Sequence, residues 1–212
     1  MNETEYFDVF TPDGIKIGKE ARSVVHAKGL WHQTFHCWIW KQSPEGPYLL
    51  FQLRHKNKDV FPSLLDISCA GHLQAGEDVP DGVRELEEEL GIAVAIDELT
   101  YLREVAQEHI VPPQIIDREF NHVFIYECGR DLQDYRIQTE EISGLFWVRL
   151  SDFQQLLCGN TESLSSDGIL VDEVNGATIS LTKTWSIGDF TPATPEYYEL
   201  LFTKMKELAK ET

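Results

Sequence analysis

The stretch GHLQAGEDVPDGVRELEEELGI, residues 71–92, decides the fold of this 212-residue chain. Its second half places three apolar residues at positions i, i+3 and i+7: Val83, Leu86 and Leu90. That spacing puts all three on one face of a helix, and the glycine that follows is a typical helix stop. The stretch therefore predicts a loop that leads into a helix over residues 79–90.

Carboxylates gather on another face of this predicted helix. Glu85, Glu88 and Glu89 stand at i, i+3 and i+4, so their side chains share a face. Like charges at this spacing repel, which leaves two interpretations: a solvated acidic surface or a cation site. The preceding loop brings Glu77 toward the start of the helix, and clustered carboxylate oxygens are ligands that suit Mg²⁺ and Mn²⁺. We expect a divalent-cation site here.

Strand-like segments flank the helix on both sides in the sequence. The predicted strands are β-rich or alternating runs at residues 31–41, 48–56, 100–110, 120–128 and 141–150. Turn residues, including Asn175-Gly176, predict hairpins over residues 5–20 and 169–181. Further helices are predicted at residues 151–158 and 195–212. Strands and helices in this order indicate an α/β layered fold.

The stretch at 71–92 resembles the signature of the Nudix family, G-x5-E-x7-R-E-U-x-E-E-x-G-U, in which U is a bulky apolar residue. The matching residues are Gly71, Glu77, Arg84, Glu85, Leu86, Glu88, Glu89, Gly91 and Ile92. Six residues separate Glu77 from Arg84, where the family pattern has seven. The resemblance implies a Nudix-type α/β/α sandwich with a mixed central sheet, an N-terminal hairpin, and a C-terminal hairpin plus helix.

The same resemblance implies an activity and a role for each motif residue. The protein is expected to hydrolyse a diphosphate joined to another moiety, X, with Mg²⁺ or Mn²⁺ as cofactor. Glu85, Glu88 and Glu89 would be catalytic metal ligands, and Glu77 would be a further ligand. Arg84 would hold the loop and orient the carboxylates through charge-assisted hydrogen bonds.

A second resemblance covers roughly residues 5–153 and is to the isopentenyl diphosphate isomerase-like branch of the same superfamily. It is carried by FDVFTPDGIKIG, VHAKGLWHQTFHCWIW and DREFNHVF. That branch holds a metal with histidines and acids, and the matching positions are His26, His32, His72, Asp117 and Glu119. His72 would also contact substrate, and either Glu119 or Glu89 would be the general base. The alternative for His32 is an ordinary strand histidine.

The isomerase depends on a cysteine directly before the Gly-His of the loop, where this chain has Ala70. Cys69 stands one residue earlier, and alternation along a strand predicts that its side chain faces the other side. We therefore favour a hydrolase. The alternatives are an isopentenyl diphosphate isomerase-type enzyme and a non-catalytic nucleotide-binding regulator.

Composition narrows the choice of partners. Eighteen Lys and Arg against 36 Asp and Glu give a formal charge of −18, which disfavours a nucleic acid polymer or an anionic membrane. We expect a small-molecule diphosphate substrate, with Arg54 and Lys56 near its outer phosphate, and a homodimer is one option for assembly.

The length of the chain and its first residues lead to expectations about domain organisation and cellular location. The length suits a single domain over residues 1–212, with a core at about 31–157 and extensions at 1–30 and 158–212. The four cysteines are widely spaced, and the first residues do not combine a basic region with an apolar run. The expected location is the cytoplasm.

Overall fold

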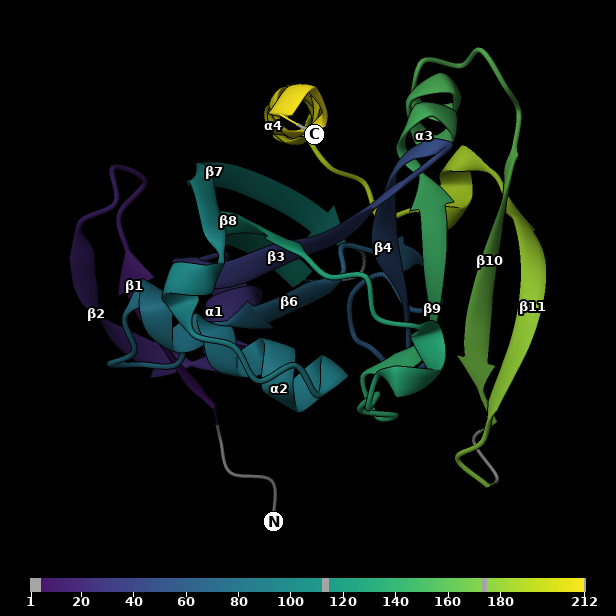
Figure 1. Cartoon of the computed structure of the whole chain (residues 1–212). Helices are drawn as coiled ribbons and strands as arrows, with labels where there is room; N and C mark the ends of the chain where they lie inside the picture. Colours follow the sequence, from purple (N-terminus) through teal and green to yellow (C-terminus); the bar gives the residue numbers. More distant parts are fainter. Residues whose placement is uncertain (1–4, 112–114, 173–174, 212) are drawn as a thin grey trace.

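A computed structural model describes residues 5–111, 115–172 and 175–211. Its strands form one mixed sheet, in which β11, β10, β9, β4, β3, β1 and β2 are successive neighbours (Figure 1). Branching from this order, β6 and β8 also pair with β3, β7 pairs with β8, and β5 pairs with β4. The predicted α/β fold with a mixed sheet is confirmed.

The elements have the following bounds. The strands are β1 Tyr6–Phe10, β2 Lys16–Ala21, β3 Trp31–Ser43, β4 Gly46–Arg54, β5 Leu65–Asp66, β6 Cys69–His72, β7 Thr100–Val111, β8 Ile115–Glu127, β9 Ile142–Arg149, β10 Leu164–Val171 and β11 Thr178–Trp185. The α-helices are α1 Arg22–Lys28, α2 Arg84–Leu90, α3 Leu150–Leu157 and α4 Pro195–Glu211, and a 3₁₀ turn, Val79–Val83, precedes α2.

Strand β3 separates two apolar cores because its side chains alternate between the two faces of the sheet. Phe35, Cys37 and Ile39 belong to the core that includes the apolar side of α2. Trp38 and Trp40 belong to the core beneath α4. The two helices accordingly lie on opposite sides of the sheet (Figure 1).

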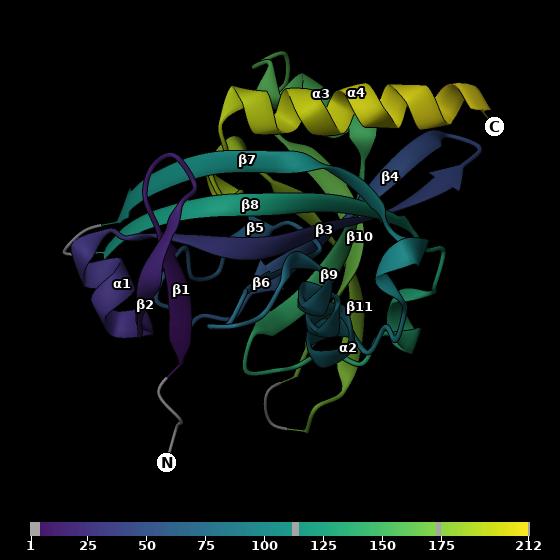
Figure 2. The ribbon, with the colours of Figure 1, turned by 90° about the vertical axis from the view of Figure 1, so that its left-hand side faces the viewer.

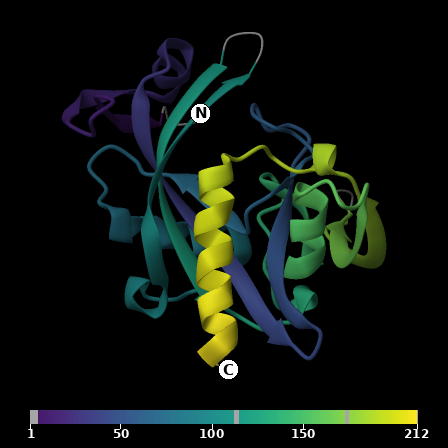
Figure 3. The ribbon, with the colours of Figure 1, turned by 90° about the horizontal axis from the view of Figure 1, so that it is seen from above.

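Helix α4 packs against β7 and β4 on the side of the sheet away from α2 (Figures 2 and 3). Its buried residues Tyr197, Leu201 and Met205 recur every four positions and face the core. The predicted amphipathic C-terminal helix is therefore confirmed, and it covers the same face of the sheet that carries the histidines described below.

The structure corrects several predicted boundaries. The helix expected over residues 79–90 is α-helical only from Arg84, because residues 79–83 form the 3₁₀ turn. The strand expected to reach residue 56 ends at Arg54. The predicted hairpin at 169–181 is confirmed by the antiparallel pairing of β10 with β11, although residues 173 and 174 of its connection lie outside the described residues.

Helix α1 was not predicted, and its sequence RSVVHAK contains two adjacent β-branched valines, which favour strands. The helix ends at Gly29, whose φ of 61° is the left-handed conformation that glycine adopts without strain. Within the residues that the structure describes, no helix has the length and apolar character needed to cross a membrane.

Candidate functional site

Arg84, at the start of α2, ties the loop to the helix. Its Nε and Nη2 donate to the two carboxylate oxygens of Glu77, at 2.7 and 3.0 Å. Nη2 also donates to the backbone carbonyl of His72, at 3.0 Å. On the helix, Nη1 lies 2.5 Å from Glu85 and 3.2 Å from Glu88. One guanidinium therefore contacts the loop and two of the three predicted ligands.

The 3₁₀ turn explains how Glu77 reaches Arg84 with one residue fewer than the family pattern. A 3₁₀ helix rises ~2.0 Å per residue against ~1.5 Å in an α-helix, so five residues cover more distance. Both oxygens of Glu77 accept hydrogen bonds from Arg84, and one also accepts from the backbone N–H of Gln74. In this structure Glu77 therefore contacts Arg84, and its role as a metal ligand stays a prediction.

Gly71 is required by the close approach of β6 to α2. A Cβ at this position would lie 2.0 Å from the carboxyl carbon of Glu85 and 2.2 Å from one of its oxygens. Any larger residue would therefore displace that carboxylate. This steric demand explains the glycine that opens the motif, and it places the backbone just before His72 against the acidic face of α2.

Burial distinguishes the three glutamates of α2. The side chain of Glu88 is 53% exposed, whereas Glu85 and Glu89 are buried. Burial raises the pKa of Glu85 to about 7 and that of Glu89 to about 8, and the charge of Glu85 contributes to the shift at Glu89. Oε2 of Glu89 is buried without a hydrogen-bond partner in the described part of the chain. Two carboxylates that resist ionisation when alone are suited to binding a cation.

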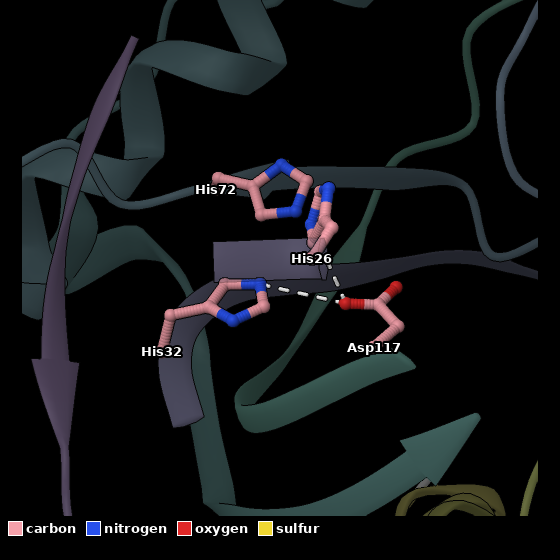
Figure 4. A group of neighbouring side chains, drawn as sticks. All are labelled: His26, His32, His72 and Asp117. Atoms are coloured by element: carbon pink, nitrogen blue, oxygen red, sulfur yellow. Dashed lines mark ion pairs between the residues drawn. The ribbon is translucent and has the colours of Figure 1, made fainter. Parts of the chain in front are cut away.

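Four side chains from four different elements form a second cluster (Figure 4). His26 comes from α1, His32 from β3, His72 from the end of β6 and Asp117 from β8. One ligand atom from each lies within 4.8 Å of the others. The four residues were predicted from the second resemblance, and the structure brings them together.

Glu119 completes this cluster. It is the register partner of His32 in the parallel pairing of β3 with β8, so both side chains are on the same face. Its Oε1 lies 3.7 Å from Nε2 of His72 and 3.9 Å from Nε2 of His32. Burial and the charge of Asp117 raise the pKa of Glu119 well above its usual range.

The tautomer of His32 shows that a cation fits the cluster. Nδ1 of His32 is 3.1 Å from the carbonyl of Leu30, which can only accept, so Nδ1 carries the proton. The bare Nε2 then faces Oδ1 of Asp117 at 3.5 Å. Neither atom has a hydrogen-bond partner among the described residues. Two lone pairs at this separation repel, and a cation between them would remove the repulsion.

The other ligand atoms have the same character. Nε2 of His26 lies 3.6 Å from Oδ1 of Asp117, and Nε2 of His26 and of His72 are buried without hydrogen bonds in the described chain. Burial lowers the pKa of His26 and of His32 to about 4, so both rings are neutral and able to donate a lone pair to a metal near neutral pH. Ligands at ~2.1 Å from an ion lie at most ~4.2 Å apart, so only a small closure is needed.

Phe7 forms an apolar wall behind the histidines. Its ring stacks on His72 at a centroid distance of 4.6 Å and on His32 at 5.3 Å, and only 1% of Phe7 is exposed. Phe7 belongs to β1, so the N-terminal hairpin holds two of the rings in place.

Both clusters line one cavity of about 1040 Å³. The lining includes the three glutamates of α2 and, from the second cluster, His26, His72, Asp117 and Glu119. The remainder of the lining includes an aromatic region made of Trp38, Phe51, Phe61, Tyr197 and Tyr198. An acidic and histidine-rich part therefore adjoins an aromatic part within a single space.

The two predicted phosphate contacts have different surroundings. Arg54 lines the cavity, but its Nη1 donates to Asp66 at 2.7 Å and its Nε to the carbonyl of Val60 at 3.1 Å. Lys56 lies in an exposed turn beyond the end of β4 and is not among the lining residues. Lys58, which was not predicted, lines the cavity and pairs with Glu141.

The residues of β6 before His72 are arranged as alternation predicted. Ala70 lines the cavity, whereas Cys69 is fully buried in the core on the α2 side. Burial raises the pKa of the Cys69 thiol well above its usual range, and the carboxylates of Glu89 and Glu85 add to this shift. Cys69 is therefore a poor nucleophile or acid in this structure.

Three further lining residues had no predicted role: His36, Gln107 and Tyr197. His36 follows His32 by four positions on one strand, so alternation could have placed it on the same face. Tyr197 belongs to α4, far along the chain, and no local sequence signal connects it to β3.

Comparisons with known proteins agree with this geometry. The NUDIX domain family model matches residues 31–164. An uncharacterized Nudix hydrolase of Clostridium acetobutylicum is 35% identical over 205 residues, which cover 97% of this chain and 98% of that protein. Isopentenyl-diphosphate Delta-isomerase 2 of Photorhabdus laumondii is 29% identical over 142 residues, which cover 66% of this chain and 75% of that protein.

A solved structure from Deinococcus radiodurans has a similar fold. It aligns with a TM-score of 0.53 at 20% identity and covers 73% of this chain and 90% of that one. At this identity the likeness concerns the fold alone.

Proposed function

Because the chain belongs to the Nudix family of hydrolases, we propose that it cleaves a phosphoanhydride bond with the help of divalent metal ions. The substrate is a nucleoside diphosphate linked to X, or a related organic diphosphate. Mg²⁺ or Mn²⁺ is the cofactor of this proposal.

The observation that carries the proposal is the shared cavity. The glutamates of α2 and the cluster of histidines and acids line the same space, although they come from separate segments. A diphosphate is strongly anionic, and this protein carries a formal charge of −18, so the substrate needs local positive charge. Cations held by these residues would neutralise the diphosphate and lower the pKa of an attacking water.

The chain's own residues have distinct tasks in this proposal. Glu85, Glu88 and Glu89 hold the cations of the α2 site, with Arg84 fixing their orientation. His26, His32, His72 and Asp117 hold a further cation, for which their nitrogen ligands suit Mn²⁺ or another transition metal better than Mg²⁺. Glu119 or Glu89 accepts the proton of the attacking water, since both carboxylates have raised pKa values.

A second candidate function is an isopentenyl diphosphate isomerase-type reaction. The cluster of histidines and acids favours it, as does the similarity to an isomerase of Photorhabdus laumondii. Against it, Ala70 occupies the cavity position that the resemblance assigns to the essential cysteine, and Cys69 is buried on the other face. The hydrolase is therefore the proposal, and the isomerase is its alternative.

A substrate panel tests the two candidates together. Purified protein is incubated with nucleoside diphosphates, dinucleotides, nucleotide sugars and isoprenoid diphosphates, each with Mg²⁺, with Mn²⁺ and with EDTA. We expect metal-dependent release of phosphate-containing products from at least one class. Isomerised isopentenyl diphosphate without hydrolysis would establish the alternative.

The panel can also contradict both enzymatic candidates. Tight binding of a nucleotide without turnover under any metal condition would indicate a regulator. Undiminished hydrolysis in EDTA would contradict the metal assignment.

A further inference from the structure

The loop of the motif contains a hydrogen-bonded turn over residues 74–77. The N–H of Glu77 donates to the carbonyl of Gln74 at 2.9 Å, and Gly76, the third residue of the turn, has a φ of 93°. A type II turn requires a positive φ at its third position, which explains the glycine. The turn's own hydrogen bond uses neither the N–H of Ala75 nor that of Gly76. These two backbone donors are therefore available to partners outside the turn.

The N-terminal hairpin supplies both partners. The carbonyl of Tyr6 accepts from the N–H of Ala75 at 2.7 Å, and Oδ2 of Asp8 accepts from the N–H of Gly76 at 3.0 Å. Lys16 of β2 pairs with the same oxygen of Asp8, and only 13% of the Asp8 side chain is exposed. The hairpin thus presents a sheltered, ion-paired acceptor to the turn.

The turn determines where Glu77 meets Arg84. Glu77 accepts from Nε and Nη2 of Arg84 through both of its oxygens. Nη1 of the same guanidinium contacts Glu85 and Glu88. If Glu77 loses its place, the guanidinium is free to turn more of its donors toward Glu85 and Glu88, where it competes with a cation for their oxygens. Order in the turn is therefore linked to the cation affinity of α2.

We propose that Asp8 is a positioning residue of this turn and that, by accepting the N–H of Gly76, it tightens the binding of divalent cations by the glutamates of α2. The inference rests on the cation site of the proposed function. It adds a segment outside the family match to that site, since β1 precedes residues 31–164. Asp8 is not among the residues that line the cavity, so its effect passes through the turn and not through contact with a bound cation.

Four variants separate the parts of this arrangement. Asp8→Ala removes the acceptor, whereas Asp8→Asn keeps a side-chain oxygen that can accept from Gly76. Lys16→Met removes the ion pair and leaves Asp8 in place. Asp13→Ala is the matched control, because Asp13 is an exposed aspartate of the same hairpin.

Binding of Mg²⁺ is measured by isothermal titration calorimetry on metal-free protein, so that the result does not depend on turnover. Mg²⁺ reports on the α2 site because it prefers oxygen ligands. We expect Asp8→Ala to raise the dissociation constant about tenfold, since the turn loses a hydrogen bond to a charged acceptor. Asp8→Asn and Lys16→Met should stay within about threefold of the native value, because each retains an acceptor for Gly76. Asp13→Ala should bind as the native protein does.

Amide hydrogen exchange separates positioning from general destabilisation. Exchange is followed by NMR in the metal-free proteins, together with their thermal midpoints. Asp8→Ala should speed exchange at Gly76 about fivefold or more, while the amides of β3 stay protected. A merely structural role would lower the midpoint and speed exchange throughout the hairpin, without a change in the Mg²⁺ dissociation constant of the folded protein.

The outcomes are distinguishable from failure of the proposed function. A folded Asp8→Ala protein with native affinity for Mg²⁺ would overturn the inference while the hydrolase stands, and so would an Asp8→Asn protein as impaired as Asp8→Ala. Weakened Mg²⁺ binding in Asp8→Ala, without hydrolysis of any substrate by the native protein, would overturn the hydrolase and leave the inference standing.

Discussion

Arg84 illustrates how much of the site depends on single side chains. Its guanidinium has five donors in a fixed geometry, and here they reach Glu77, the carbonyl of His72, Glu85 and Glu88. A lysine could supply the charge but not these simultaneous directions. Arg84 does not contact Glu89, so it leaves the Glu89 carboxylate available to a cation.

Removal of one α2 carboxylate should slow catalysis strongly without unfolding the protein. Glu88→Gln or Glu89→Gln should lower kcat on the order of 10²-fold or more, because each removes charge that holds a cation in the transition state. Rates and thermal midpoints are measured for each variant on the substrate that the panel identifies. The side chains are isosteric, so the midpoint should fall little, and full activity in both variants would contradict the assignment.

Exchanges at two positions of β6 should have opposite outcomes. His72→Ala should lower kcat/KM at least tenfold, which corresponds to ~1.4 kcal/mol of transition-state stabilisation, because His72 belongs to the second cluster. Cys69→Ala should leave turnover nearly unchanged, since Cys69 lies outside the cavity lining. Loss of activity in a folded Cys69→Ala protein would favour the isomerase instead.

Some site residues could be predicted from sequence, and others could not. The α2 carboxylates and Arg84 stand within one short segment, so helical spacing alone puts them together. His26 could be assigned only by resemblance, because the helix that carries it has a strand-like sequence. The contact between His36 and Tyr197 joins residues 161 positions apart, and no local pattern contains such a contact.

At the scale of elements, α2 and β6 form a unit that buries two carboxylates whose ionised forms are unfavourable. Gly71 lets the strand approach, and α2 buries Glu85 and Glu89 behind it. The short strand β6 of this unit was not predicted, whereas the longer strands of the sheet were, since alternation and aromatic content are local properties. The 3₁₀ turn was not predicted either, although Pro80 in its first turn and the capping box of Asp78 with Asp81 support a helical start at residue 79.

The two buried carboxylates predict how the stability of the metal-free protein depends on pH. The pKa values of Glu85 and Glu89 in the folded protein, about 7 and 8, exceed the usual 4.5. As pH rises, the unfolded protein therefore releases these two protons at lower pH than the folded protein does. Their contribution to stability is therefore present below pH 4.5 and is lost as pH rises through 8. His26 and His32, with pKa values lowered to about 4, act in the opposite direction, but only below pH 6.5.

Between pH 6.5 and 8 the glutamates dominate, so the thermal midpoint in EDTA should fall with rising pH. Melts at half-unit pH intervals measure this slope. Glu89→Gln should make the slope shallower, because the amide does not titrate, while Glu104→Gln, at an exposed position on β7, serves as the control. A midpoint that rises with pH in this window would contradict the assigned shifts.

At the scale of the whole molecule, the cavity depends on segments from both ends of the chain. The N-terminal hairpin supplies Phe7, α1 supplies His26, and α4 supplies Tyr197 from beyond the family match at 31–164. Each of these three segments contributes a side chain to the lining of the same cavity. Bound cations would therefore link α1, β3, β6 and β8 with α2, and they should stabilise the entire fold.

Metal should accordingly raise the thermal midpoint of the protein. A ligand at ~100 times its Kd stabilises a fold by ~2.7 kcal/mol, and 1 kcal/mol shifts a protein of 150–250 residues by ~2–4 °C, so we expect about 5–10 °C. Melts are recorded at pH 7.5 in EDTA, in saturating Mg²⁺ and in saturating Mn²⁺.

A variant with Glu85, Glu88 and Glu89 all changed to Gln should lose the response to Mg²⁺, because that ion prefers oxygen ligands. It should retain a response to Mn²⁺ through the histidine cluster, whereas His72→Ala should keep its full response to Mg²⁺ and lose only part of its response to Mn²⁺. An unchanged midpoint in native protein with both ions would mean that the two clusters are only buried polar groups.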